Sequence, residues 1–283
     1  MTTDWQPLEI GSEGKRGFVL SSPLMPAAGF FGYGRAYAGV LDARLFGALI
    51  TQPTALHPRS GRESSGFARL RGGFILPEPA PNPGISAALR EFAPSWRRWQ
   101  VPVIVAVAVA DAGEAGAIAT HLEREESVSA IELLVPPDAD GTWLAGVMAA
   151  LTAECELPVL VKLPLLRATP LAGAAIAGGA AALVLGTPHY GTEPLTGISG
   201  PVYGPATLPY TVLALRRALM LGLAGSVSVP LIASGGIYTA ADVEACRQSG
   251  AQAVQLDGLI FLDPAAAAEL ARAYAPAADA DHF

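Results

Sequence analysis

The residues best suited to chemistry lie in two glycine-containing segments near the end of the chain. Ser234-Gly-Gly-Ile237 follows one short apolar run, and Gly258 follows the next. Glycines let backbone N–H groups approach a phosphate closely, and turns after the last two strands of a barrel frequently bind phosphate groups. A tight turn without a ligand is the alternative interpretation, and location together with spacing favours the phosphate. We therefore expect Ser234, Gly235, Gly236 and Gly258 to form a phosphate cradle.

Two charged residues bear on this cradle. Asp257 stands directly before Gly258, and its carboxylate would repel a phosphate unless it points away or binds a cation. Lys162 is one of two lysines in the chain and lies within an apolar run. Burying an unpaired ammonium is costly, so Lys162 needs a negative or electron-rich partner. That partner is either a bound group at the end of the strand or a carboxylate such as Glu132.

The elements that must position these residues alternate between short apolar runs and segments that fit helices. Continuous apolar runs are typical of parallel strands buried on both faces. Eight runs are expected to be strands: Leu24–Ala28, Ala48–Thr51, Val103–Val107, Ala130–Val135, Val159–Leu163, Ala182–Leu185, Leu231–Ala233 and Ala253–Leu256. Helices are expected over Ile85–Phe92, Ala112–Glu125, Thr142–Glu154, Leu208–Leu221 and Ala240–Ser249, the last with Thr239 as its N-cap. This α/β alternation predicts a (β/α)8 TIM barrel spanning residues 1–283 as a single domain.

Two segments go beyond a minimal barrel. Leu8–Ile10 and Gly17–Leu20 predict an N-terminal β-hairpin that covers the amino-terminal end of the barrel. Pro53–Pro83 predicts a long loop after strand two, because it is rich in Pro, Gly, Arg and Ser and exceeds an ordinary connection in length. Long loops at the carboxyl end of barrel strands usually carry function.

Composition excludes several classes of function. Of 283 residues, 51% are hydrophobic and 15% are charged, which excludes a disordered chain. A net charge of -7 disfavours binding to nucleic acid. Cys155 and Cys246 lie far apart without metal-binding spacing, so neither a disulfide framework nor a metal site is expected. No signal peptide or membrane span is expected, and these observations together predict a soluble, cytoplasmic protein.

Seven segments in order resemble one known family over nearly the whole chain. They are Ser22–Gly34, Gly47–Gly61, Asn82–Gly84, Ile131–Leu133, Val161–Leu163, Gly197–Pro201 and the Gly235-Gly236-Ile237 turn. The chain resembles the dihydroorotate dehydrogenases, in particular the class 1 cytosolic flavoenzymes. The resemblance implies a barrel that holds FMN across its mouth, with the isoalloxazine ring near Ala28 and Lys162 against its pyrimidine end.

The resemblance also implies a set of cofactor-binding residues and partners. The residues are Ala28, Gly29, Gln52, Lys162, Thr187, Ser199, Gly200, Ser234, Gly235, Gly236 and Gly258. For Ser199 and Gly200, a plain turn is the competing interpretation. Family members often form homodimers, and some pair with an iron–sulfur flavoprotein subunit.

Departures from the family pattern concern the substrate. Leu76, Ala106, Leu134 and Gly186 stand where the family places asparagines that hold the substrate. Each lost anchor removes about 1–3 kcal/mol of discrimination, so dihydroorotate is not the expected substrate. The position of the catalytic base falls on Pro137, which cannot accept a proton, and Gln52 replaces a lysine.

Two other residues are candidates for the missing base. Asp138 follows Pro137 directly, and His189 lies just past the sixth expected strand, at the face where catalytic residues gather in barrels. A solvated loop carboxylate is the favoured interpretation of Asp138. A packed or solvent-facing imidazole is the favoured interpretation of His189.

Two functions follow from these patterns and remain nearly balanced. The first is a diverged FMN-dependent oxidoreductase of CH–CH bonds that acts on a small molecule other than dihydroorotate. The second is a catalytically silent, flavin-free relative that acts as a subunit or binding module. Gln52, Pro137, Asp257 and the lost asparagines favour the second.

Overall fold

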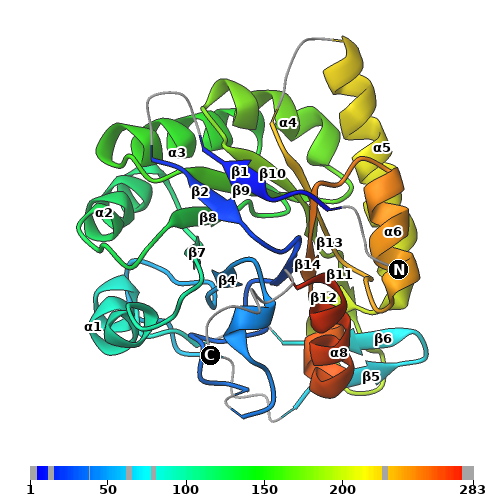
Figure 1. Ribbon diagram of the computed structural model, residues 1–283. Helices are drawn as coiled ribbons and strands as arrows, with labels where there is room; N and C mark the ends of the chain where they lie inside the picture. Colours follow the sequence, from blue (N-terminus) through cyan, green and yellow to red (C-terminus); the bar gives the residue numbers. More distant parts are fainter. Residues whose placement is uncertain are drawn as a thin grey trace.

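A ring of eight parallel strands forms the centre of the molecule (Figure 1). The computed structural model describes residues 5–11, 16–37, 39–61, 66–77, 81–224 and 229–275. The strands are hydrogen-bonded in the order β3-β14-β13-β10-β9-β8-β7-β4. Their bounds are β3 Leu24–Pro26, β4 Leu49–Ile50, β7 Val103–Val107, β8 Ala130–Leu134, β9 Val159–Pro164, β10 Ala182–Thr187, β13 Leu231–Ser234 and β14 Ala253–Leu256. The two end strands meet where the Gly47 amide donates to the Leu24 carbonyl at 2.9 Å, so the predicted TIM barrel is confirmed.

These segments are strands because they are apolar on both faces. All five residues of β7 are buried: Ile104 and Ala106 face the barrel axis, and Val103, Val105 and Val107 face the surrounding helices. β-branched side chains such as Val103 and Ile104 fit this doubly covered position. The strand bounds agree with the predicted ones within a few residues.

Helices surround the barrel. Their bounds are α1 Ile85–Trp96, α2 Ala112–Glu123, α3 Gly141–Glu154, α4 Ala168–Ala177, α5 Leu208–Ala224, α6 Ala240–Gln248, α7 Gly258–Leu262 and α8 Pro264–Tyr274. The predicted N-cap of α6 is confirmed, since Thr239 and Asp242 form a capping box. Helix α1 extends beyond its predicted end because Trp96 is buried, and its indole donates to the Tyr33 carbonyl at 3.1 Å.

The predicted hairpin covers the amino-terminal end of the barrel. Strands β1 (Leu8–Ile10) and β2 (Phe18–Leu20) pair in antiparallel fashion and lie across the ring (Figure 1). Ile10 and Leu20 are fully buried among inward-facing barrel residues such as Ile104. The opposite, carboxyl-terminal end of the strands is therefore the accessible mouth.

A second sheet covers part of the mouth. It has the order β11-β12-β6-β5, with bounds β11 Tyr190–Thr192, β12 Ser199–Tyr203, β6 Gly73–Ile75 and β5 Ala68–Leu70. The segment after β4 is thus not wholly a loop, because it contains the β5–β6 hairpin. The β5–β6 hairpin has little signal in the sequence, because each of its two strands has only three residues. In addition, β6 pairs with β12, which is distant in the sequence. Gly73 permits this pairing, because a Cβ there would lie 1.8 Å from the Tyr203 carbonyl oxygen.

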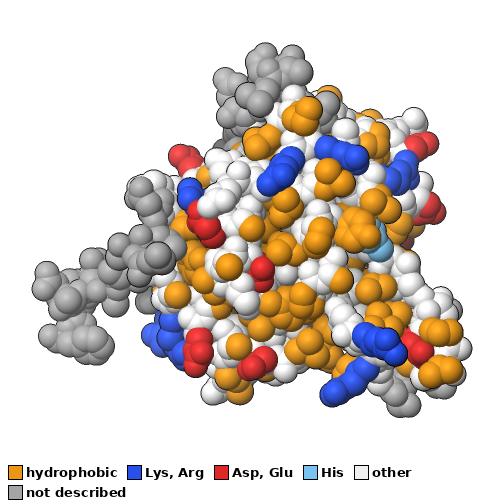
Figure 2. Space-filling model, turned by 90° about the vertical axis from the view of Figure 1, so that its right-hand side faces the viewer, with side chains coloured by type: hydrophobic (Ala, Val, Ile, Leu, Met, Phe, Trp, Pro, Cys, Tyr) orange, Lys and Arg blue, Asp and Glu red, His pale blue; other side chains and the backbone are white. Residues whose placement is uncertain are grey.

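One outer face carries exposed apolar side chains. Figure 2 shows hydrophobic side chains spread across the face that carries α5 and α6. Tyr190 of β11 and both Tyr210 and Leu213 of α5 are among the exposed large hydrophobic residues. None of the described helices is long and apolar enough to cross a membrane.

Candidate functional site at the barrel mouth

A cavity of about 70 Å³ lies between the carboxyl ends of the strands and the second sheet. Its lining includes Ala27, Ala28, Phe30, Pro53, Leu134, Lys162, Gly186, Thr187, Pro188, Tyr190, Pro201, Tyr203, Ser234 and Asp257. Pockets that bind drug-sized ligands and cofactors usually measure about 300–1,000 Å³. The cavity is therefore too small for a flavin ring system.

Aromatic side chains fill the space above this cavity. The ring of Tyr203 packs edge-on against Phe30, with centroids 4.9 Å apart, and stacks on Phe74 at 5.5 Å. Phe74 in turn stacks on Phe261 of α7 at 5.0 Å. Four rings from four separate parts of the chain thus hold the second sheet down on the mouth.

Lys162 is buried at the floor of the cavity and is already paired. Its Nζ donates to Gln255 Oε1 at 2.7 Å and lies 3.7 Å from Glu132 Oε1. The Gln255 amide donates at 2.5 Å to the other oxygen of Glu132. These three side chains come from β9, β14 and β8 and are almost fully buried. Of the two partners considered for the ammonium, the structure shows the barrel carboxylate.

The Asp257 carboxylate lies in the glycine-rich cradle. Its Oδ1 accepts a hydrogen bond from the Gly258 amide at 2.6 Å, and the Gly236 amide acts on the carboxylate by lowering its pKa. Burial raises the pKa of Asp257 to about 6, although these amides and the charge of Lys162 favour the ionised form. The amides that we expected to bind a phosphate therefore bind a carboxylate of the protein.

The remaining space of the cradle is filled by neighbouring atoms. Gly235 and Gly236 both have positive φ angles, of 109° and 79°, which favour glycine. A Cβ on Gly236 would lie 2.2 Å from the Leu208 amide nitrogen, and a Cβ on Gly258 would lie 2.1 Å from the Tyr238 hydroxyl. The glycines thus allow the turns to pack closely on Leu208 and Tyr238, and the group that stands in the expected place of the FMN phosphate is the Asp257 carboxylate.

The other residues expected near the cofactor divide into two groups. Ala28, Thr187 and Ser234 line the cavity together with Lys162. Gly29 lies just beyond this lining, where its positive φ of 90° turns the chain and its amide donates to the Thr51 carbonyl at 3.3 Å.

The second group lies outside the cavity lining. The Gln52 side chain donates to the Pro81 carbonyl. Ser199 shares a hydrogen bond of 2.8 Å with the Thr192 hydroxyl at the edge of the second sheet. Gly200 packs on the backbone of Leu76, where a Cβ would lie 2.0 Å from the carbonyl oxygen. The contacts of these residues stabilise the second sheet and the segment after β4.

Neither candidate base reaches the cavity. Asp138 is exposed and lines a separate hollow of about 420 Å³ beside Asp140 and Trp143. The His189 ring packs edge-on against Tyr210 with centroids 5.0 Å apart, and burial lowers its pKa. Its Nε2 is buried without a hydrogen-bond partner among the described residues. Neither side chain therefore lines the cavity in which Lys162 lies.

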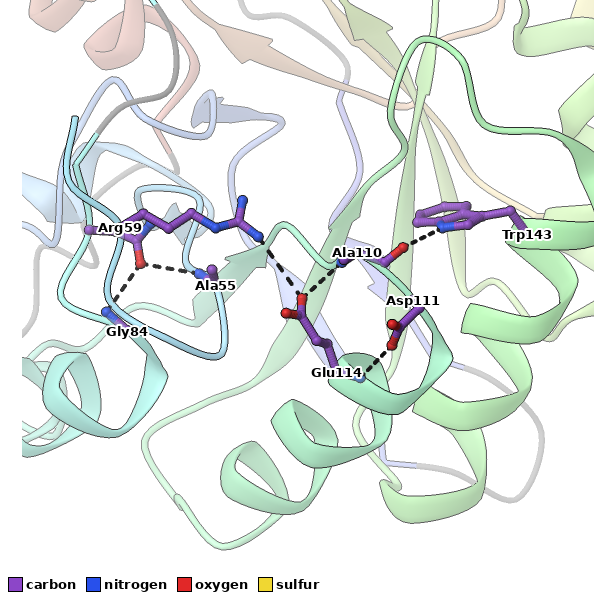
Figure 3. A network of polar contacts seen from close by, with 8 residues as sticks. Ala55, Arg59, Gly84, Ala110, Asp111, Glu114 and Trp143 are labelled. Carbon is purple, nitrogen blue, oxygen red and sulfur yellow. Dashed lines mark hydrogen bonds and ion pairs between the residues drawn. The ribbon is translucent and has the colours of Figure 1, made fainter. Parts of the chain in front are cut away.

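A polar network fixes the rim of the mouth next to the segment after β4 (Figure 3). Glu114 accepts a hydrogen bond of 2.8 Å from the Ala110 amide and lies 3.9 Å from the Arg59 guanidinium. The Trp143 indole donates to the Ala110 carbonyl at 2.9 Å, which links α2 to α3. The Asn82 side-chain oxygen accepts from the Gly84 amide at 3.1 Å. This network makes the motif that begins at Asn82 a structural one.

Two residues of the site were not identified from the sequence. Gln255 is a polar residue within the otherwise apolar β14, and that exception was the available signal for its contact with Lys162. Tyr238 offers no comparable signal, because an aromatic residue after a Gly-Gly-Ile turn has many ordinary packing roles. Its hydroxyl lies against Gly258 and has no hydrogen-bond partner among the described residues.

Comparisons with known proteins agree with this architecture. The family model described as dihydroorotate dehydrogenase matches residues 16–274. A dihydroorotate dehydrogenase A (fumarate) of Lacticaseibacillus paracasei is 33% identical over 90% of this chain and 95% of its own length. The catalytic subunit of a dihydroorotate dehydrogenase B (NAD(+)) of Geobacillus sp. is 32% identical over 88% of this chain and 84% of its own length.

A solved structure supports the fold. The dihydroorotate dehydrogenase of Eimeria tenella, crystallised with ferulenol, has a TM-score of 0.75 and 16% identity, and covers 94% of this chain and 83% of its own. The chain belongs to the dihydroorotate dehydrogenase family, and is therefore a dihydroorotate dehydrogenase-like member of a family of oxidoreductases.

The positions that depart from the family pattern lie around the same cavity. Leu134 and Gly186 contribute to its lining, and Ala106 is fully buried within β7. A Cβ on Gly186 would lie 2.2 Å from the Ser234 Cβ, so an asparagine does not fit there without a shift of β13. The mouth thus combines lost hydrogen-bonding groups with tighter packing.

The buried charges at the floor allow a first prediction. Replacing Lys162 with Met leaves the Glu132 carboxylate buried without its cation, which costs about 3–5 kcal/mol of unfolding free energy. The double variant Glu132→Gln with Lys162→Met has no buried charge at this site, so it should recover most of that loss. Urea unfolding followed by circular dichroism measures both values. A loss below about 1 kcal/mol in the single variant would contradict the pairing.

The Asp257 carboxylate allows a second prediction. Its pKa is about 6 when folded, against about 3.9 in an unfolded chain, so the folded state binds this proton more tightly. The resulting stabilisation is complete below about pH 4 and is lost as the pH rises through about 6. Asp257→Asn lacks this dependence. Relative to it, the wild-type protein should lose about 3 kcal/mol of unfolding free energy between about pH 4 and about pH 7.5, and parallel profiles would refute the assignment.

Proposed function

We propose that this member of the dihydroorotate dehydrogenase family functions without FMN, as a catalytically silent subunit or binding module. The observation that carries the proposal is the position of Asp257, whose carboxylate accepts a hydrogen bond from the cradle amide of Gly258. A phosphate dianion cannot share that donor with a buried carboxylate, because like charges at contact distance repel strongly.

Two further features support this proposal independently of the cradle. The cavity of about 70 Å³ leaves no space for a three-ring system beside Lys162. The Lys162 ammonium already has Gln255 and Glu132 as partners, so it does not require an electron-rich cofactor to offset its burial.

The residues available for proton transfer also favour a silent protein. Pro137 stands at the position of the family's base, and neither Asp138 nor His189 lines the cavity. A general base must lie within hydrogen-bond reach of the proton that it removes. Neither Asp138 nor His189 can therefore replace the lost base, and Asp257, the carboxylate that does line the cavity, is held by the Gly258 amide.

A diverged flavin-dependent oxidoreductase for another small molecule is the second candidate. The observation that favours it is that Lys162, Thr187 and Ser234 still face one common cavity. This function requires Asp257, Tyr238 and the aromatic cover to leave their present positions before a flavin can bind.

A silent barrel needs a partner in order to act, and we propose a protein partner in the cytoplasm. The partner is a second copy of the chain or an iron–sulfur flavoprotein subunit, as in some relatives of this family. The Geobacillus relative is named as a catalytic subunit, which supports the proposal that this chain also works in an assembly. Exposed Tyr210 and Leu213 on α5 offer apolar contact area, and two buried cysteines that are not joined in a disulfide suit a reducing compartment.

Flavin content tests the proposal. The purified protein should be colourless, and FMN at about 100 µM should raise its melting temperature by less than about 1 °C, because a ligand without affinity for the folded state adds no stability. Absorbance at the visible flavin bands measures the flavin content of the purified protein. Differential scanning fluorimetry measures the shift in its melting temperature. Riboflavin serves as the matched ligand that lacks the phosphate.

The opposite result is equally clear. A yellow protein with near-equimolar FMN, or a melting temperature that rises with FMN and not with riboflavin, would establish the flavin-dependent oxidoreductase in place of the silent protein.

A further inference from the structure

We infer that Asp257 is a resident anion that replaces a phosphomonoester in the cradle, so that removing its carboxylate opens a binding site for phosphate. This inference rests on the proposed flavin-free function, and it names Asp257 as the residue that prevents a phosphate from binding. A single side chain, placed between the two glycine turns, is what closes the anion site.

The donors of the site are backbone amides from two turns. The Gly258 amide donates to Asp257 Oδ1 at 2.6 Å, and the Gly236 amide of the other turn favours the charged form of the same carboxylate. The other oxygen, Oδ2, lies on the side of Gly235, where a Cβ would stand 3.9 Å away. Asp257 is 3% exposed, so its carboxylate is enclosed by these groups as a bound anion would be.

The turns keep their shape without the Asp257 side chain. The Thr211 hydroxyl lies 3.1 Å from the Ser234 carbonyl oxygen and 2.9 Å from that of Gly235, which anchors the first turn to α5. Gly236 packs on the Leu208 backbone. The amides therefore stay directed at the same point when Asp257 is shortened to glycine.

The charges around the site favour an anion once Asp257 is neutral or absent. Lys162 contributes the positive charge that acts on Asp257, and Glu132 balances part of it from behind Lys162. The Tyr238 hydroxyl is buried next to Gly258 without an acceptor among the described residues, and it offers one further donor. Burial and the charge of Asp257 raise the pKa of Tyr238, so this hydroxyl keeps its proton.

The ligand class is a small phosphate, and not a flavin. Shortening Asp257 to glycine frees the space of one small side chain next to the cradle amides, and the rings of Phe30, Phe74 and Tyr203 still cover the mouth. The opened site should thus bind inorganic phosphate or the phosphate end of a phosphomonoester, and it should not bind riboflavin.

Isothermal titration with inorganic phosphate tests the inference on the full-length protein. Asp257→Gly should bind phosphate at least about tenfold more tightly than the wild type, because it loses a charge that competes for the same donors. Asp138→Gly is the matched control, since it removes an exposed carboxylate of the same face that lies outside the cavity. Its affinity for phosphate should equal that of the wild type.

Three outcomes overturn the inference. The first is a folded Asp257→Gly protein without any gain over the wild type, and the second is an equal gain in Asp138→Gly, which would indicate general electrostatics. If Asp257→Gly does not fold, Asp257→Ala serves instead, because it also removes the group that accepts from the Gly258 amide and keeps a Cβ that restricts the unfolded chain. It should bind phosphate at least about threefold more tightly than the wild type at about pH 8, where the wild-type carboxylate is ionised, and no gain is the third.

The same titrations separate this inference from the proposed function. Binding of FMN by the wild type would refute the proposed function together with the inference. A wild type that binds neither FMN nor phosphate, with an Asp257→Gly variant that also binds neither, would refute the inference alone.

Discussion

Two anions cannot share one set of amide donors, and in this barrel the carboxylate of Asp257 already has them. The Gly236 and Gly258 amides come from turns after adjacent strands, and the fold directs both at a single point. Because the carboxylate is part of the chain, it is present at that point at all times without a cost of association. Every other feature of the mouth is consistent with this occupied state. The cavity is small, the aromatic cover is closed, and the nearby ammonium has internal partners.

Lys162 shows how a residue can persist while its surroundings change. In the family that the chain resembles, this lysine is expected to contact the flavin. Here the Gln255 amide bridges it to Glu132, so that one buried cation, one buried anion and one amide form a connected network. Removing one member of such a network is costly, which gives Lys162 a structural reason to remain. The presence of a lysine at this position is therefore weak support for flavin binding.

The sequence predicted the barrel well because its strands are short continuous apolar runs that alternate with segments that fit helices. It favoured a phosphate in the cradle and noted the charge of Asp257 against it, but it could not decide whether that carboxylate points into the cradle or away from it. Two features of the site depend on contacts between distant parts of the chain and could not be predicted. The second sheet pairs β6 with β12, and the Tyr238 hydroxyl packs on Gly258. Asp138 and His189 lay close in sequence to the expected base and mouth, yet adjacency along the chain did not bring their side chains to the cavity.

The relatives explain why the resemblance alone does not decide the function. At 32% and 33% identity, this chain shares the barrel and the order of its motifs with dihydroorotate dehydrogenases. A barrel positions side chains independently of the chemistry that they perform, so function has to be argued from the residues at the mouth. At the mouth of this chain, Leu134 and Gly186 line the cavity and the Asp257 carboxylate accepts from the Gly258 amide, which is the basis of the proposed flavin-free function.

A crystal structure of the protein grown with millimolar FMN tests the central claim most directly. We expect electron density for the Asp257 carboxylate on the Gly236 and Gly258 amides, with Tyr238 against Gly258 and no flavin at the mouth. A flavin phosphate on those amides, with Asp257 turned away from them, would contradict the account.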